Sequence, residues 1–272
     1  MRPHELLALA VAACLLATAC SRLSFVKPSA KRGGSEQIAR QYDFSEGRRA
    51  KSDGTVYLHL GRAEQHLNAG RNEEAAKEAQ AAIDLDGRSD AAHMVFAVAS
   101  ERMGRDEVAG RHFARAAELS PGSGAMLNNY GAWLCRNGRE AESLAWFDRA
   151  IADRTYATPA SALANAGACA ERGGQPARVE RDLRAALQLD PDNAVALGEL
   201  AGHRFRSGSY FEARAFSQRR LDAAPVTPAA LLLASQIEEK LGDKAAAARY
   251  VQRLRTEFPQ SQAVLPGESS SP

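Results

Sequence analysis

The chain has 272 residues, of which 45% are hydrophobic, 25% are charged and only 6% are aromatic. Its 35 lysines and arginines nearly balance 33 aspartates and glutamates, which gives no support to a nucleic-acid binder with a concentrated basic excess. Four cysteines are too few for a small domain built around disulfides, and the length is enough for one large or two ordinary domains.

An apolar run from Leu6 to Ala19 follows the basic residue Arg2. The run is shorter than the roughly 20 residues that span a bilayer, so we interpret residues 1–19 as a signal peptide. Small residues precede Cys20 as in a bacterial lipobox, and we expect Cys20 to be acylated and to become the amino terminus. Two alternatives stay open: a second lipobox that ends at Cys14, and an ordinary signal peptide in which Cys20 is incidental.

The residue after the cysteine bears on the destination of such a lipoprotein. In enterobacteria an aspartate at this place holds a lipoprotein at the inner membrane, whereas this chain has Ser21. The resemblance implies that the protein is lipid-anchored at the outer membrane, on its periplasmic side. The membrane partner is then reached through the N-terminal lipid.

Residues 20–54 have the composition of a flexible tether. The segment from Ser21 to Lys51 has eight basic and three acidic side chains and shows no helical period. Such a charge run is typical of a solvated segment, and weak attraction to anionic lipid head groups is the alternative. At the other end, residues 262–272 are rich in serine, glycine and proline and are expected to be disordered.

Between these segments, glycine recurs at an interval of 34 residues, with a single interval of 36, at Gly70, Gly104, Gly138, Gly174, Gly208 and Gly242. Mostly small residues stand five and twelve positions after the glycines, and helix breakers stand seventeen after most of them. This period is the pattern of tetratricopeptide repeats, in which the glycine joins helix A to helix B. The sequence therefore predicts an all-α, right-handed solenoid of six helix-turn-helix repeats over residues 55–261. The two extra residues fall within 154–159 and predict an irregularity after the third repeat.

Motifs that carry catalysis or bind metal are missing from the sequence. It contains no His-Glu-x-x-His pair, no Cys-x-x-Cys and no Gly-x-Ser-x-Gly. We therefore expect no enzyme activity, no metal or other cofactor and no small-molecule substrate.

The inner wall of the solenoid is the remaining candidate for a site. With each glycine counted as position 15 of its repeat, the wall is formed by positions 2, 5, 9, 12 and 13 of helix A. The candidate groove residues are Tyr57, Leu60, Leu67, Met94, Val98 and Asn128. Leu60 and Glu64 replace the lysine and asparagine of a carboxylate clamp, so an apolar peptide or strand is the expected partner. The alternative is that part of this set is core between the repeats, and the sequence leaves both open.

Cys135 and Cys169 stand at positions 12 and 10 of helix A in the third and fourth repeats. Because neighbouring A helices pack alongside each other, the two could approach to the roughly 5.5–6 Å Cα separation of a disulfide, which the oxidising periplasm permits. Two buried free thiols are the alternative.

Three segments carry a closer resemblance: Leu-Asn-Asn-Tyr-Gly at residues 127–131, Tyr-Ala-Thr-Pro at 156–159, and Asn-Ala-Gly-Ala-Cys-Ala at 165–170. They resemble the signature of the PilF/PilW family of type IV pilus lipoproteins, which also have a lipobox, a tether and six repeats. This chain departs from the family pattern at Ala157, where a proline is common, and at Arg220 and Leu254, where a small residue is expected. Those last two changes put the packing of the C-terminal repeats in question.

The resemblance implies a pilotin function. The protein would bind the outer-membrane secretin of the type IV pilus, helping it reach the outer membrane and form its multimer, or would stabilise the pilus. The alternative is a general repeat-containing assembly lipoprotein of the outer membrane, for example in the β-barrel insertion machinery.

Overall fold

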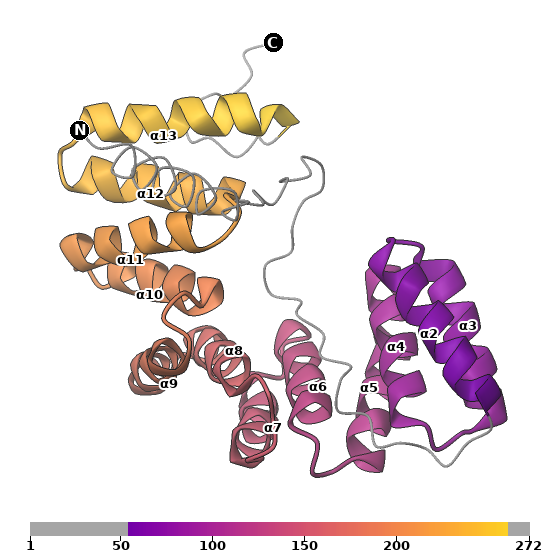
Figure 1. Cartoon of the computed structure of the whole chain (residues 1–272). Coiled ribbons are helices and arrows are strands. Elements are labelled where there is room, and N and C mark those ends of the chain that lie inside the picture. The colour runs from indigo at the N-terminus through magenta and orange to yellow at the C-terminus, as the bar shows by residue number, and fades with distance from the viewer. Residues whose placement is uncertain (1–53, 261–272) are drawn as a thin grey trace, which may run out of the picture. The chain divides into compact units, whose positions relative to one another are not determined.

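The computed structural model describes residues 54–260, which form twelve α-helices and no strand within that range (Figure 1). The predicted signal peptide, Cys20, the tether up to residue 53 and the tail 262–272 lie outside the described residues. None of the twelve helices is both long enough and apolar enough to cross a bilayer. The helices are α2 (Gly54–Asn68), α3 (Asn72–Leu85), α4 (Asp90–Arg102), α5 (Asp106–Leu119), α6 (Gly124–Arg136), α7 (Glu140–Ala152), α8 (Pro159–Arg172), α9 (Pro176–Leu189), α10 (Ala194–Arg206), α11 (Tyr210–Ala223), α12 (Pro228–Lys240) and α13 (Lys244–Glu257).

The helices form six consecutive pairs. In each pair the first helix, called the A helix here (α2, α4, α6, α8, α10 and α12), packs against the B helix that follows it. Each B helix from α3 to α11 also packs against the next A helix. No pair could bury its apolar stripe alone, so stacking of neighbours supplies the core. The predicted fold class, a tetratricopeptide-repeat solenoid of six repeats, is confirmed.

The six periodic glycines make the turns inside the pairs. Each has a positive φ, between 66° and 82°, a region that side chains with a Cβ rarely occupy. The 34-residue glycine period therefore reports a backbone requirement that recurs once in every repeat.

The last residue of a repeat, position 34, is polar in most repeats and caps the A helix of the next repeat. The Ser89 hydroxyl accepts a hydrogen bond from the Ala92 N–H, which satisfies a free donor at the start of α4. Ser123, Asn193 and Thr227 cap α6, α10 and α12 in the same way. Thr158, before α8, makes no such side-chain bond, and it belongs to the junction with the two extra residues.

This junction is the irregularity that the sequence predicts after the third repeat. α7 ends at Ala152 and α8 begins at Pro159. In the connection, the Asp153 carboxylate accepts a hydrogen bond from the Gly124 N–H at 2.8 Å, and Tyr156 is buried. The Tyr156 ring lies so close to Gly124 that a Cβ there would be 2.5 Å from a ring carbon.

A methyl group at this position should therefore destabilise the fold. Gly124→Ala is expected to cost about 1–3 kcal/mol of unfolding free energy, because the ring and the connection must shift to admit it. Gly61→Ala in α2 is the matched control, since a Cβ at Gly61 meets nothing within 4 Å. Urea unfolding followed by circular dichroism measures both. Equal stability of the two variants would contradict the packing described.

The departures at position 27 are accommodated. Arg220 is buried, and its guanidinium donates to the backbone carbonyls of Ala224 and Pro225 at 3.3–3.4 Å. Gly198 on α10 lies opposite, and a Cβ there would sit 3.9 Å from the Arg220 side chain. Leu254 is buried in the last pair. The larger side chains therefore fit where alanine is usual.

Candidate partner-binding surface

The structure divides the predicted groove residues into two groups. Tyr57 on α2 is 48% exposed and Leu60 is partly buried. Leu67, Met94, Val98 and Asn128 are at most 2% exposed. The assignment of these four to an open wall is wrong, because neighbouring helices cover them and they form the interior between repeats. The alternative interpretation, core between the repeats, holds for them.

Side chains at positions 5 and 6 link successive A helices. The Asn129 amide donates to the Met94 sulfur at 3.3 Å, from α6 to α4. The Asn165 amide donates to the Asn128 side-chain oxygen at 3.1 Å, from α8 to α6. We call this recurring contact the 6-to-5 contact. It explains why Asn128 faces the next repeat and not a partner.

The ends of the A helices are linked by a second recurring contact, made by an arginine at position 13. The Arg102 guanidinium donates to the Leu67 carbonyl at 2.7 Å. Arg136 pairs with the buried Glu101, with Nε 2.8 Å from the carboxylate. Further on, Arg206 pairs with Glu171 at 2.7 Å.

The junction of α6 with α8 has a covalent bond in place of this ion pair. Cys135, at position 12, forms a disulfide with Cys169, with their Cα atoms 5.8 Å apart. The Arg172 guanidinium at position 13 lies 3.8 Å from the Cys135 sulfur. The structure thus contains the disulfide and not the two free thiols that the sequence left as its alternative.

What remains of the groove at the first repeat is a short face of α2. We define the α2 face as Tyr57, Leu60 and Glu64, which share one side of the helix at positions 2, 5 and 9. Burial raises the pKa of Glu64. The α2 face is therefore mainly apolar and partly accessible, as a surface that binds an apolar segment requires.

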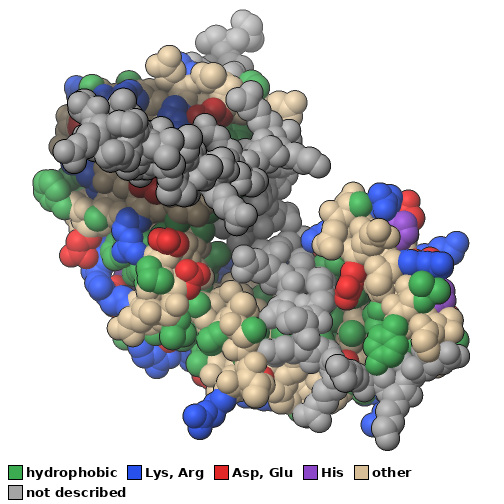
Figure 2. Space-filling view, viewed as in Figure 1, with side chains coloured by type: hydrophobic (Ala, Val, Ile, Leu, Met, Phe, Trp, Pro, Cys, Tyr) green, Lys and Arg blue, Asp and Glu red, His purple; other side chains and the backbone are tan. Residues whose placement is uncertain are grey.

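Other exposed apolar side chains are spread over the molecule. The exposed large ones besides Tyr57 are Leu58, Leu85, Leu189 and Phe211, on α2, α3, α9 and α11. On the face seen in Figure 2, hydrophobic side chains alternate with basic and acidic ones. Isolated exposed apolar residues of this kind are normal and do not define a site.

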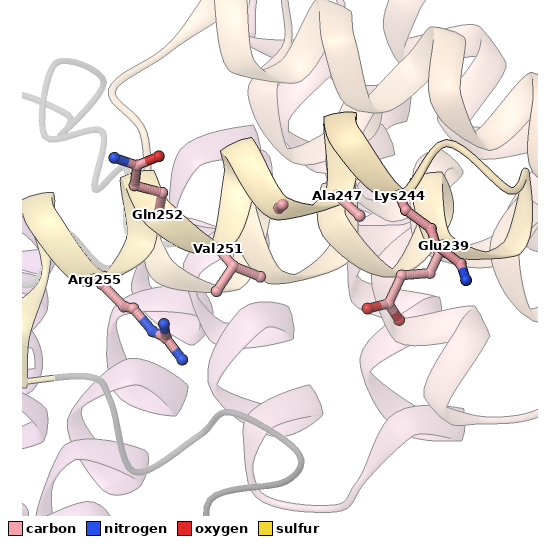
Figure 3. A pocket seen from close by; sticks show the side chains of 7 residues that line it. Glu239, Lys244, Ala247, Val251, Gln252 and Arg255 are labelled. Atoms are coloured by element: carbon pink, nitrogen blue, oxygen red, sulfur yellow. The ribbon is translucent and has the colours of Figure 1, made fainter.

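Hollows lie in the C-terminal repeats. One of about 730 Å³ follows α13 and is lined by Ala247, Val251 and Arg255 together with Glu239 from the end of α12 (Figure 3). A smaller one of about 250 Å³ lies between α10, α11 and α12. Both escaped the sequence analysis, which placed the candidate site in the first three repeats. Among residues 54–260, no three His, Cys, Asp or Glu side chains are grouped as a metal site.

A histidine pair makes stability depend on pH. The Nδ1 atoms of His93 and His112 are 2.9 Å apart, and the other His93 nitrogen lies 3.2 Å from the Gly87 carbonyl. Burial, aided by the nearby His93 and Arg111 charges, lowers the pKa of His112 to about 4. Burial also lowers the pKa of His93, although Asp90, Asp86 and the Gly87 bond oppose this and Arg115 assists it.

We expect the protein to lose stability as the pH falls from about 6.5 to about 4. In the unfolded chain, His112 takes up its proton near pH 6.5, whereas in the folded chain it does so only near pH 4. Between these two pH values the unfolded state binds more protons than the folded state, so acid favours unfolding. His112→Gln should reduce this loss by about 1–2 kcal/mol, allowing for partial solvent screening. Urea midpoints at pH 7.5 and 5 for the variant and wild type measure it. An unchanged pH dependence would show that the pair does not titrate as described.

Known proteins resemble this chain both in sequence and in fold. Residues 60–124 match the tetratricopeptide repeat family. Over 215 residues the chain is 24% identical to the type IV pilus assembly protein PilF of Pseudomonas aeruginosa, covering 79% of this chain and 84% of PilF. The fold is similar to the crystal structure of PilW, a widely conserved type IV pilus biogenesis factor, with a TM-score of 0.71, 30% identity and coverage of 78% of this chain and 97% of PilW. A structure of P. aeruginosa PilF gives a TM-score of 0.68 at 22% identity, covering 77% of this chain and 94% of the other.

Proposed function

Because this chain belongs to the PilF/PilW family of type IV pilus biogenesis proteins, we propose that it is an outer-membrane lipoprotein that binds the pilus secretin and promotes its localisation and multimerisation. The observation that carries the proposal is the similarity to PilW, which extends over nearly the whole of that chain at 30% identity. The protein would act as a scaffold without catalysis. Stabilisation of the pilus is the second form that this role could take. The lipid on Cys20 would anchor the protein at the outer membrane.

The α2 face is the proposed contact with an apolar secretin segment. α2 packs on α3 and α4, and it is the first helix of the described solenoid. Tyr57 remains half exposed there, whereas Met94 and Val98, at wall positions 5 and 9 of the second repeat, are covered. Tyrosine suits such a contact because it offers a large rigid apolar area with a polar end.

A deletion strain tests the function. We expect the amount of heat-stable secretin multimer in its outer membranes to fall, and the full-length chain to restore it. Tyr57→Glu should fail to restore it, whereas Leu85→Glu, an equally exposed change on α3, should succeed. Normal multimers together with normal surface pili in the deletion strain would end the proposal. Normal multimers with few pili would move the role to fibre stability, and a general loss of β-barrel proteins would favour the assembly-factor alternative.

Lipidation is tested separately with Cys20→Ala. The variant protein should be released from outer membranes, because it lacks the residue that carries the acyl chains. Several chains are needed to hold a bacterial lipoprotein, since one chain alone binds only marginally. Fractionation and palmitate labelling are the measurements. A variant that is still processed, labelled and membrane-bound would assign the anchor to Cys14 or another residue.

A further inference from the structure

The 6-to-5 contact joins α4 to α6 and α6 to α8, but it does not continue from α8 to α10. Position 6 of α10 is Glu199, and position 5 of the preceding A helix is Ala164. The alanine methyl offers nothing to a carboxylate, and Glu199 has no hydrogen bond or ion pair with any residue in 54–260. Burial raises the pKa of Glu199, although Arg172 and Arg206 oppose this and Glu171 adds to it.

The neighbouring positive charges are committed elsewhere. Arg206 pairs with Glu171 at 2.7 Å, and His203 binds the same carboxylate, also at 2.7 Å. Arg172 is directed to the Cys135 sulfur. Arg220 donates to backbone carbonyls at the end of α11. Each cation near Glu199 therefore has another partner, and the Glu199 carboxylate remains without a donor.

The carboxylate lines the cavity of about 250 Å³ between α10, α11 and α12. Small or apolar residues form most of the remaining wall, among them Gly198 and Ala201 on α10 and Leu233 on α12. The small residues at these positions leave the space empty. The Arg220 side chain also lines it, with its guanidinium bonded to the carbonyls of Ala224 and Pro225. A partly buried carboxylate at an apolar cavity costs free energy unless a cation with hydrogen-bond donors reaches it.

We propose that this cavity receives a lysine or arginine side chain from an extended segment of the partner protein, with Glu199 as its counter-ion. The aliphatic stem of such a side chain would pack on Leu233 and the alanines, and its charged end would donate to the Glu199 carboxylate. This inference rests on the proposed function, because it adds a contact for the secretin in the fifth and sixth repeats, separate from the α2 face.

The binding test uses the full chain and labelled overlapping peptides that cover the periplasmic part of the secretin. A peptide with a basic residue should bind the wild-type protein, and Glu199→Gln should weaken it at least about tenfold. Replacing the basic residue of the peptide with methionine should cause a similar loss, and the two changes together should add little more. Glu239→Gln, at an exposed carboxylate on α12, is the control and should bind normally.

Stability separates recognition from a structural role. Glu199→Gln should melt at or above the wild-type temperature, because the carboxylate has no partner to lose. Glu238→Gln is the contrast, because Glu238 is buried and paired with Arg214, so its removal should lower the melting temperature.

The outcomes distinguish this inference from the proposed function. Peptide binding that is insensitive to Glu199→Gln, or that needs no basic residue, overturns the inference and leaves the function intact. The same holds if no peptide binds while the deletion strain still lacks secretin multimers. A marked fall in melting temperature for Glu199→Gln would assign the residue to the fold and also overturn the inference. Normal multimers and pili in the deletion strain would end both proposals.

Discussion

Met94→Glu is expected to unfold the second repeat at pH 7. Met94 is fully buried on α4, and its sulfur accepts the hydrogen bond from Asn129. A glutamate there has no cation within the core, so it must be held neutral far above its usual pKa, at a cost of about 3–4 kcal/mol. Typical domains have only about 5–15 kcal/mol of stability, and in a repeat array each repeat holds a fraction of the total, so a loss of this size is enough to unfold the second repeat. Circular dichroism melts and urea unfolding measure the change.

Tyr57→Glu is the control for this variant, because the half-exposed Tyr57 places the new charge in water. It should melt close to the wild type. The comparison also affects the functional test: a cell that carries Met94→Glu would lack folded protein, so missing secretin multimers would say nothing about binding. If Met94→Glu melted as the wild type does, Met94 would belong to an open wall after all.

The difference between these two residues shows how far the sequence could be interpreted. The glycine period fixes the turns, so the six helix pairs follow directly from it. Tyr57 and Met94 hold wall positions 2 and 5 of their repeats, and the general rule treats them alike. Their exposure differs because Asn129 of the next A helix reaches Met94. The rule considers positions along one helix and takes no account of side chains that reach it from the neighbouring helix.

The Glu199 cavity was missed for a similar reason. It depends on residues of two repeats: Ala164 on α8 in place of a polar partner, and Gly198 on α10 together with Arg220 on α11 in place of a small residue. Arg220 and Leu254 were noticed as departures, but the sequence did not show that the Arg220 guanidinium turns to backbone carbonyls. Such combinations become visible only when the distances across the repeats are known.

Removal of the disulfide is expected to weaken the centre of the solenoid. The bond joins residues 34 apart, and closing a loop of that length in the unfolded chain corresponds to about 3–4 kcal/mol in the loop-entropy description. Cys135→Ala with Cys169→Ala should lose about this much in urea unfolding. The wild type in reductant should lose a similar amount, and reductant should leave the double variant unchanged. Intact mass with and without reduction, after alkylation, verifies the bond, and two alkylated thiols at these positions in unreduced, denatured protein would contradict it.

The position of the bond determines which part of the protein should respond. Arg136 joins α6 to α4 through Glu101, and Arg206 joins α10 to α8 through Glu171, but the α6–α8 junction has Cys135 where those acids stand. In a repeat protein stability is approximately a sum of repeat and interface contributions, so loss of one interface lowers the coupling there. Hydrogen exchange of the double variant should therefore accelerate most in α6 and α8, and progressively less in repeats farther from this junction. A uniform acceleration over all repeats would show that the bond acts on the whole array and not on this junction.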